Sequence, residues 1–291
     1  MTEIGSSAFD GCESLKTIQI PDSVISIKEC TYSGCLSLEE VSIPDSIIEI
    51  EGGAFDGCES LRNVHIPASV MNIESDAFYG CHSIHYTVDD ENEYYSSESG
   101  ALFDKEKKIL IVGYPLVHNG QCTIPDSVMV IAKYSFDMCT ALTEIHIPDS
   151  VIWIEEYAFV GCESLNKVNI PSFLEIACGA FQGCIQAYFT VDEDNEYYSS
   201  KSGALYNKKR DSLLIGYSLV SNGECTIPDN VAVIGRDAFN YCSSLTVRIP
   251  RTVKKIESYA FGGCNSLKVY MSTPIELEAY SFPKTTTVIM E

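Results

Sequence analysis

The chain is short of positive charge and has no long apolar run. Its 291 residues hold 19 Lys and Arg against 41 Asp and Glu, a formal net charge of −22. Such a field repels nucleic acids and anionic membranes, so we exclude both as main partners. No run of 18 apolar residues occurs, and the sequence therefore predicts no membrane insertion in this segment.

The sequence also lacks the patterns of the common catalytic sites. It contains no Ser/His/Asp arrangement and no glycine-rich phosphate loop. A Cys/His pair would need a reactive thiolate beside a base, and the cysteines have a structural explanation instead. We therefore predict a protein that is not an enzyme and that needs no cofactor.

What the sequence has in abundance is one repeated motif, typified by residues 54–67. Its aromatic residue recurs every 23 residues at the start of the chain and every 21–23 residues in most of the remainder. A fixed period of this length is the signature of a solenoid. The repeated aromatics are Phe9, Tyr32, Phe55, Phe78, Phe136, Phe159, Phe181, Phe239, Phe261 and Phe282.

Each repeat has three parts. Leu-x-x-Val-x-Ile-Pro, as in Leu61–Pro67, predicts a strand that proline ends. A short turn follows, usually Asp-Ser. Val70–Cys81 shows the third part, in which Ala-Phe fits a single helical turn and Gly allows a tight return. Stacked coils would then bury a continuous column of Leu, Val, Ile and Phe.

The period is interrupted twice, by 58-residue gaps between Phe78 and Phe136 and between Phe181 and Phe239. The two intervening segments, Thr87–Val128 and Thr190–Val231, are identical at 27 of 42 positions. Each predicts a polar stretch followed by a β-hairpin. The expected hairpin strands are Ala101–Phe103 with Ile109–Val112, and Ala204–Tyr206 with Leu213–Ile215.

We therefore expect one solenoid domain over residues 1–291. The chain starts in mid-repeat at Ile4 without a signal peptide, so we expect a piece of a longer protein whose export signal has been removed. The last repeat lacks its Ile-Pro and Gly-Cys, which is typical of a cap. The expected segments are regular repeats at 1–86, 123–189 and 226–266, hairpin modules at 87–122 and 190–225, and a C-terminal cap at 267–291.

Nine of the 13 cysteines stand three residues after the repeated aromatic. Cysteine is small and commonly buried, so this phase predicts a ladder of reduced, buried thiols. Cys30 and Cys178 fall outside the phase, and whether they are free or paired stays open. The nine are Cys12, Cys35, Cys58, Cys81, Cys139, Cys162, Cys184, Cys242 and Cys264.

These repeats resemble the BspA-like leucine-rich repeat of about 23 residues, and the two modules resemble that family's recurring insertions. The resemblance covers nearly the whole chain and implies an α/β repeat fold. This fold is a right-handed solenoid with a parallel sheet on its concave face, short helical or 3-10 turns and two inserted β-hairpins. It also implies a non-enzymatic protein of the cell surface or a secreted one, with host or microbial surface proteins or glycans as ligands.

The residue between the last two apolar positions of the first strand should point outward onto the concave face. A ligand could be held there, as on other solenoids. The alternative is a solvated polar sheet surface. The candidate ligand-binding residues are Gln19, Ser42, His65, His146, Asn169 and Arg248.

No metal site is predicted. His82 should point away from Cys81, so the two cannot converge on zinc. The acidic runs 89–93 and 192–196 lack the spacing of a calcium loop and are better read as solvated loops in which Asn sets a turn. The adjacent Tyr94-Tyr95 and Tyr197-Tyr198 either pack over the neighbouring coil or form a binding patch.

The favoured hypothesis is a monomeric binding module used for adhesion. One alternative is a structural spacer that displays another domain. Another is an intracellular scaffold, suggested by the unpaired thiols and the missing signal.

Overall fold

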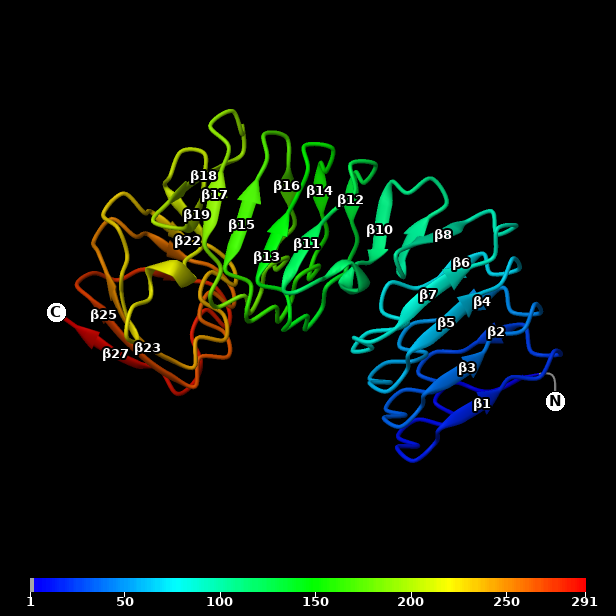
Figure 1. Cartoon of the computed structure of the whole chain (residues 1–291). Helices are drawn as coiled ribbons and strands as arrows, with labels where there is room; N and C mark the ends of the chain where they lie inside the picture. Colours follow the sequence, from blue (N-terminus) through cyan, green and yellow to red (C-terminus); the bar gives the residue numbers. More distant parts are fainter. Residues whose placement is uncertain (1–2) are drawn as a thin grey trace.

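The computed structural model describes residues 3–291, which form an arch of about 12 stacked coils with almost no helix (Figure 1). The described N-terminal coil and the C-terminus lie at opposite ends of the arch. The predicted solenoid is therefore confirmed, whereas its right-handed sense and the segment boundaries stay predictions.

The first strand of each coil joins a parallel sheet. Three such sheets of four strands follow one another, and we call them the N-terminal, middle and C-terminal first-strand sheets. In Figure 1 the strands of each sheet lie side by side along the arch. The N-terminal sheet holds β1 (Thr17–Gln19), β3 (Glu40–Ser42), β5 (Asn63–Ile66) and β7 (His85–Val88); the middle sheet β11 (Gln121–Thr123), β13 (Glu144–His146), β15 (Lys167–Ile170) and β17 (Phe189–Val191); the C-terminal sheet β21 (Glu224–Thr226), β23 (Ser244–Ile249), β25 (Ser266–Met271) and β27 (Thr287–Met290).

The second strands are shorter and form the other face of the coils. The two hairpin modules interrupt this face: β8, β9 and β10 pair antiparallel, and β10 then continues parallel into β12. The second module repeats this pattern with β18, β19, β20 and β22. The strands are β2 (Ser26–Ile27), β4 (Glu49–Ile50), β6 (Asn72–Ile73), β8 (Tyr95–Glu98), β9 (Ala101–Asp104), β10 (Ile109–Val112), β12 (Val130–Ile131), β14 (Trp153–Ile154), β16 (Glu175–Ile176), β18 (Tyr198–Lys201), β19 (Ala204–Asn207), β20 (Ser212–Ile215), β22 (Val233–Ile234), β24 (Lys255–Ile256) and β26 (Glu276–Leu277).

The helical turn expected at Ala-Phe is wrong. The corner is a series of tight turns, in which the Phe55 and Gly57 amides donate to carbonyls of the next coil at 2.8 Å rather than within a helix. Gly57 also has a φ of 68°, which a right-handed helix does not allow. Among the described residues, only Tyr114–Leu116 (η1) and Tyr217–Leu219 (η2) form 3-10 helices, both in the hairpin modules. The fold is thus a β-solenoid rather than an α/β repeat.

The aromatic residues stack as predicted, but in three columns rather than one continuous core. Phe55 stacks on Tyr32 and Phe78 with ring centroids 5.4 and 5.2 Å apart. The column then ends against the edge of Tyr86, and a new one starts in the next group of coils. The interior is accordingly divided into three apolar clusters, and a glycine of each module, Gly113 or Gly216, lies against the first ring of the next column. Phe9 was expected to plug the interior but is 39% exposed, since only one side of its ring is stacked.

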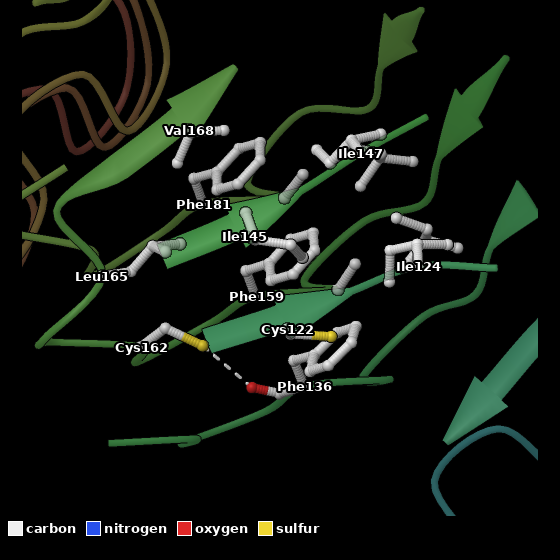
Figure 2. Close-up of a cluster of buried hydrophobic side chains, with 14 of the residues drawn as sticks. Cys122, Ile124, Phe136, Ile145, Ile147, Phe159, Cys162, Leu165, Val168 and Phe181 are labelled. Carbon is white, nitrogen blue, oxygen red and sulfur yellow. Dashed lines mark hydrogen bonds between the residues drawn. The ribbon is translucent and has the colours of Figure 1, made fainter. Parts of the chain in front are cut away.

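Most of the cysteine ladder is buried, and the structure adds a hydrogen bond to it. The Cys162 thiol donates to the carbonyl oxygen of Phe136, the aromatic of the preceding coil, at 2.9 Å (Figure 2). Burial raises the pKa of the Cys139 thiol to about 12, so such thiols are poor nucleophiles. The prediction fails for Cys12, which is exposed in the first coil, and in part for Cys242, which is half-buried.

All 13 cysteines lie among residues 3–291 and are free thiols. Cys30 is half-buried and Cys178 is exposed, and neither is paired with another cysteine.

A buried asparagine anchors each module to the coil before it. Asn92 is fully buried, and its side-chain amide donates to the carbonyl oxygens of Pro67 and Val70 at 2.8 and 3.0 Å. Its Oδ1 accepts from the amides of Tyr94 and Tyr95, both at 2.8 Å. The turn expected to be set by this asparagine is confirmed, but its side chain is buried rather than solvated, since every polar atom of it is bonded to protein.

Replacing Asn92 with alanine should lower the free energy of unfolding by about 2–3 kcal/mol, because four backbone groups, most of them buried, each lose a hydrogen bond. Urea unfolding followed by circular dichroism measures this loss. Asp90→Ala is the control, since Asp90 lies in the same loop with an exposed side chain and should stay within about 0.5 kcal/mol of the wild type. Equal stabilities for the two variants would contradict the anchoring role.

Candidate functional site

The six predicted ligand-binding residues are all exposed, as the strand alternation requires. The structure does not gather them into one site, because the hairpin modules divide the first strands into three sheets. Gln19, Ser42 and His65 lie on the N-terminal sheet, His146 and Asn169 on the middle sheet, and Arg248 on the C-terminal sheet.

On the N-terminal sheet the predicted residues form an outward row. Gln19 stands opposite Ser42 in the parallel register, and His65 stands opposite Thr87. The His65 Nδ1 lies 3.1 Å from the Thr87 hydroxyl oxygen. This row is polar and short-chained.

Arg248 is engaged within the C-terminal sheet. Its guanidinium bonds to a carboxylate oxygen of Glu291 at 2.9 Å and lies over the ring of Tyr270, 4.5 Å from the ring centroid. Arg248 thus lies on a different sheet from the other predicted residues and makes no contact with them through these interactions.

The middle first-strand sheet has an outward groove of about 490 Å³. His146 and Asn169 lie in it, on the adjacent strands β13 and β15. The Thr190 hydroxyl donates to Asn169 Oδ1 at 3.0 Å. Five further residues complete the polar and aromatic lining: Gln121, Thr123, Glu144, Lys167 and Tyr188.

A second row of polar side chains crosses the groove beside His146 and Asn169. The Glu144 carboxylate lies between the Gln121 amide and the Lys167 ammonium, with both contacts at 3.3 Å. The Lys167 side chain is 67% exposed, and exposed ion pairs of this kind contribute little to stability. These groups are therefore free to exchange their mutual contacts for contacts with a ligand.

Tyr188 supplies an aromatic surface at one end of the groove. Its side chain is half-exposed. Gly203 of the second module, with a φ of 78°, leaves room for the ring: a Cβ there would lie 2.3 Å from it. A tyrosine held flat against backbone offers a rigid contact surface at low entropic cost.

Sequence reasoning missed Gln121, Glu144 and Lys167, although the signal was present. Glu144 stands two positions before His146 and Lys167 two positions before Asn169, and residues two apart in a strand share a face. Gln121 pairs with Glu144 from the neighbouring strand β11, for which no outward residue was predicted. Because only one outward residue per strand was considered, sequence reasoning missed the second row of polar side chains in the groove.

The carboxylates of the two acidic runs bond to their own backbone. Asp89 Oδ1 accepts from the amide of Glu91, and Asp192 Oδ1 from that of Asp194, so both acidic runs form local turns. No group of three or more metal-binding side chains occurs within residues 3–291. In that same range no helix is long and apolar enough to cross a bilayer.

The adjacent tyrosines behave differently from each other. The Tyr95 hydroxyl accepts from the amide of Ile73 at 2.8 Å, whereas Tyr94 is 42% exposed. In the second module the Tyr198 hydroxyl likewise accepts from the amide of Ile176 at 3.0 Å, whereas Tyr197 is 43% exposed. The packing interpretation is confirmed for one tyrosine of each pair.

Stacked coils with parallel sheets and an outward polar groove define a leucine-rich-repeat solenoid, a class of non-enzymatic binding scaffold. The model of the BspA type leucine rich repeat region matches in six copies over residues 1–105, 118–220 and 216–289. The chain belongs to this family, as its sequence indicated. A comparison with curated proteins gives no match.

Solved structures of bacterial leucine-rich-repeat proteins share the fold. A leucine rich cell surface protein from Faecalibacterium prausnitzii is 30% identical, with a TM-score of 0.61 over 96% of this chain and 64% of that protein. This chain thus spans less than two thirds of that relative. A leucine-rich repeat protein from Eubacterium ventriosum is 22% identical, with a TM-score of 0.63 over 99% of this chain and 78% of that one. The pneumococcal vaccine antigen PcpA is 16% identical, with a TM-score of 0.51 over 96% and 68%.

Proposed function

We propose that the chain is a protein- or glycan-binding module of a cell-surface or secreted protein, and that it binds its ligand in the groove of the middle first-strand sheet. The observation that supports this most is the groove itself. It combines a rigid tyrosine with amide, carboxylate, imidazole and ammonium groups on three adjacent strands. The cell-surface relative from Faecalibacterium supports the location.

The mixed polarity of the groove suits a neutral, hydroxyl-rich or amide-rich ligand. Glu144 and Lys167 offset each other's charge, while Gln121 and Asn169 offer both donors and acceptors. Host or microbial surface proteins and glycans carry such groups. Binding to such ligands on a host or microbial surface is adhesion, which is the function that this groove suits best.

The test is a binding screen of the purified chain against matrix proteins and host or microbial glycans, with Ca²⁺ or chelator and at two salt concentrations. For a ligand found in this way, His146→Glu combined with Lys167→Glu should weaken binding at least about tenfold, the effect of losing 1.4 kcal/mol. Both side chains are exposed, so stability should change by less than about 0.5 kcal/mol.

His65→Glu is the matched control, because it stands on the N-terminal sheet in the outward phase that His146 has on the middle sheet. It should leave the affinity unchanged. An equal loss with both variants would indicate a non-specific charge effect and contradict the groove. If no ligand binds across the whole panel, the spacer hypothesis is favoured instead.

A further inference from the structure

The two hairpin modules meet the regular coils at equivalent junctions, 103 residues apart in the sequence. At the first junction Tyr79 and Tyr134 lie edge to face, with ring centroids 5.1 Å apart. With Phe78 and Tyr114 they leave a cavity of only about 10 Å³. The first junction is therefore filled by the protein's own aromatic side chains.

At the second junction Gln182 and Asp237 stand in place of these two tyrosines. A cavity of about 300 Å³ opens there, which is the lower end of the range for small-molecule sites. Its wall keeps the apolar character of the first junction, with Phe181, Leu205 and Tyr217. The second junction is thus an aromatic-sized space from which the aromatic rings are missing.

One end of this cavity is charged. The Asp237 side chain is only 9% exposed. Its Oδ1 accepts from Asn240 Nδ2 at 2.7 Å and from Gln182 Nε2 at 3.5 Å, but the nearest ionic partner of its Oδ2 is Arg236 Nε at 3.7 Å, beyond hydrogen-bonding distance. A carboxylate in this position keeps unused acceptor capacity.

The charged side chains that line the cavity determine which charge a bound ligand should carry. Asp237 and Glu257 contribute two carboxylates, and Arg236 contributes one guanidinium. The guanidinium is half-exposed, lies 5.6 Å from the ring centroid of Tyr259 and pairs with Asp237 only at 3.7 Å, so it offsets at most one of the two acids. A monocation therefore fits the cavity better than an anion.

We propose that this cavity binds a single-ring aromatic amine. The ring takes the place that Tyr79 and Tyr134 fill at the first junction, and the ammonium donates to the carboxylate of Asp237. This site is independent of the groove on the middle first-strand sheet, since the two share no residue.

Tyramine is the probe, titrated into the full chain by calorimetry. Two analogues isolate the charge: 4-ethylphenol lacks the amine, and 4-hydroxyphenylacetate carries the opposite charge. We expect tyramine to bind about 10–100-fold more tightly than 4-ethylphenol, because a hydrogen bond to a charged group contributes about 1.5–3 kcal/mol. The anion should not bind. No tyramine binding, or equal affinity for all three, would overturn the proposal.

Variants connect the binding to this cavity. Gln182→Tyr with Asp237→Tyr rebuilds the first junction and should abolish tyramine binding without lowering Tm. The backbone tolerates the second change, because Asp237 has a φ of 59° and Tyr134 at the equivalent position has 62°. Asp237→Asn removes the charge at constant shape and should reduce the affinity for tyramine to that for 4-ethylphenol. Wild-type affinity in either variant contradicts the site.

Cys178 gives an independent readout, because its exposed thiol lines the cavity. Saturating tyramine should slow its alkylation by a maleimide, measured by mass spectrometry. Cys12 is also exposed but lies in the first coil, so its rate should not change. Equal rates at Cys178 with and without tyramine would contradict occupancy of the cavity.

Discussion

Replacing Phe55 with alanine is expected to lower the free energy of unfolding by about 3–5 kcal/mol. The Phe55 side chain is fully buried and stacks on an aromatic ring on each side, Tyr32 and Phe78. Removing it leaves a void whose walls are rings from neighbouring coils, each fixed by its own backbone hydrogen bonds to the next coil. Such a site relaxes poorly, and the cost of a cavity rises with the volume that stays empty.

Phe9→Ala is the matched control, because it deletes the same side chain from the same position of the first coil. Phe9 is 39% exposed and stacks on one side only, so its loss should cost about 1 kcal/mol. Urea unfolding followed by circular dichroism measures both. Similar losses for the two variants would contradict the stacked column as the main source of stability.

Replacing Asp137 with asparagine should remove a large part of the pH dependence of stability. Asp137 is 2% exposed at the first junction, and burial raises the pKa of its carboxyl to about 7. The unfolded chain has a carboxyl pKa near 3.9, so the folded state binds more protons between about pH 4 and pH 7. Stability therefore falls as the pH rises through this range, by on the order of 4 kcal/mol in total.

Asparagine imitates the protonated carboxyl and still accepts the hydrogen bond that the Gly80 amide donates to Asp137 at 3.1 Å. The second junction already carries Asn240 at the equivalent position. Asp137→Asn should match the wild type near pH 4 and exceed its stability above pH 7. Thermal unfolding from pH 4 to pH 8 tests this.

Asp56 and Asp237 also have a raised pKa, chiefly because they are buried, and they contribute to the slope of both proteins. The difference between the two curves isolates Asp137. Parallel curves would contradict the assignment.

The phase of the repeat made most of the fold predictable. Within a repeat, the spacing from Leu61 to Ile66 identifies both the strand and its buried face, and the structure confirms this alternation. The position of Cys58 relative to Phe55 likewise predicts a buried thiol. Local periodicity determines these features, so no knowledge of distant contacts was needed.

The failures occur where the neighbouring coil, rather than the repeat itself, decides the structure. Phe9 and Cys12 have the correct sequence phase, but the first coil is stacked on one side only. The expected helix at Ala-Phe failed because the Phe55 amide bonds to the next coil, a contact that residue order alone does not show.

The sequence predicted which individual residues of the candidate site are exposed, but not which of them lie together. His65 and His146 share an outward phase, yet the first module separates their sheets. The open second junction was also present in the sequence, as the exchange of two tyrosines for Gln182 and Asp237 between related modules. Only the packing around them shows that this exchange creates a cavity.

The most direct test of the proposed function is a crystal structure of the chain bound to a ligand from the screen. We predict ligand atoms within 4 Å of Tyr188, Lys167 and His146, on the outward face of β13–β17, with contacts to the side chains that now bond to each other. A ligand held only by the hairpin modules, or by the outer second-strand face, would contradict the groove as the binding surface.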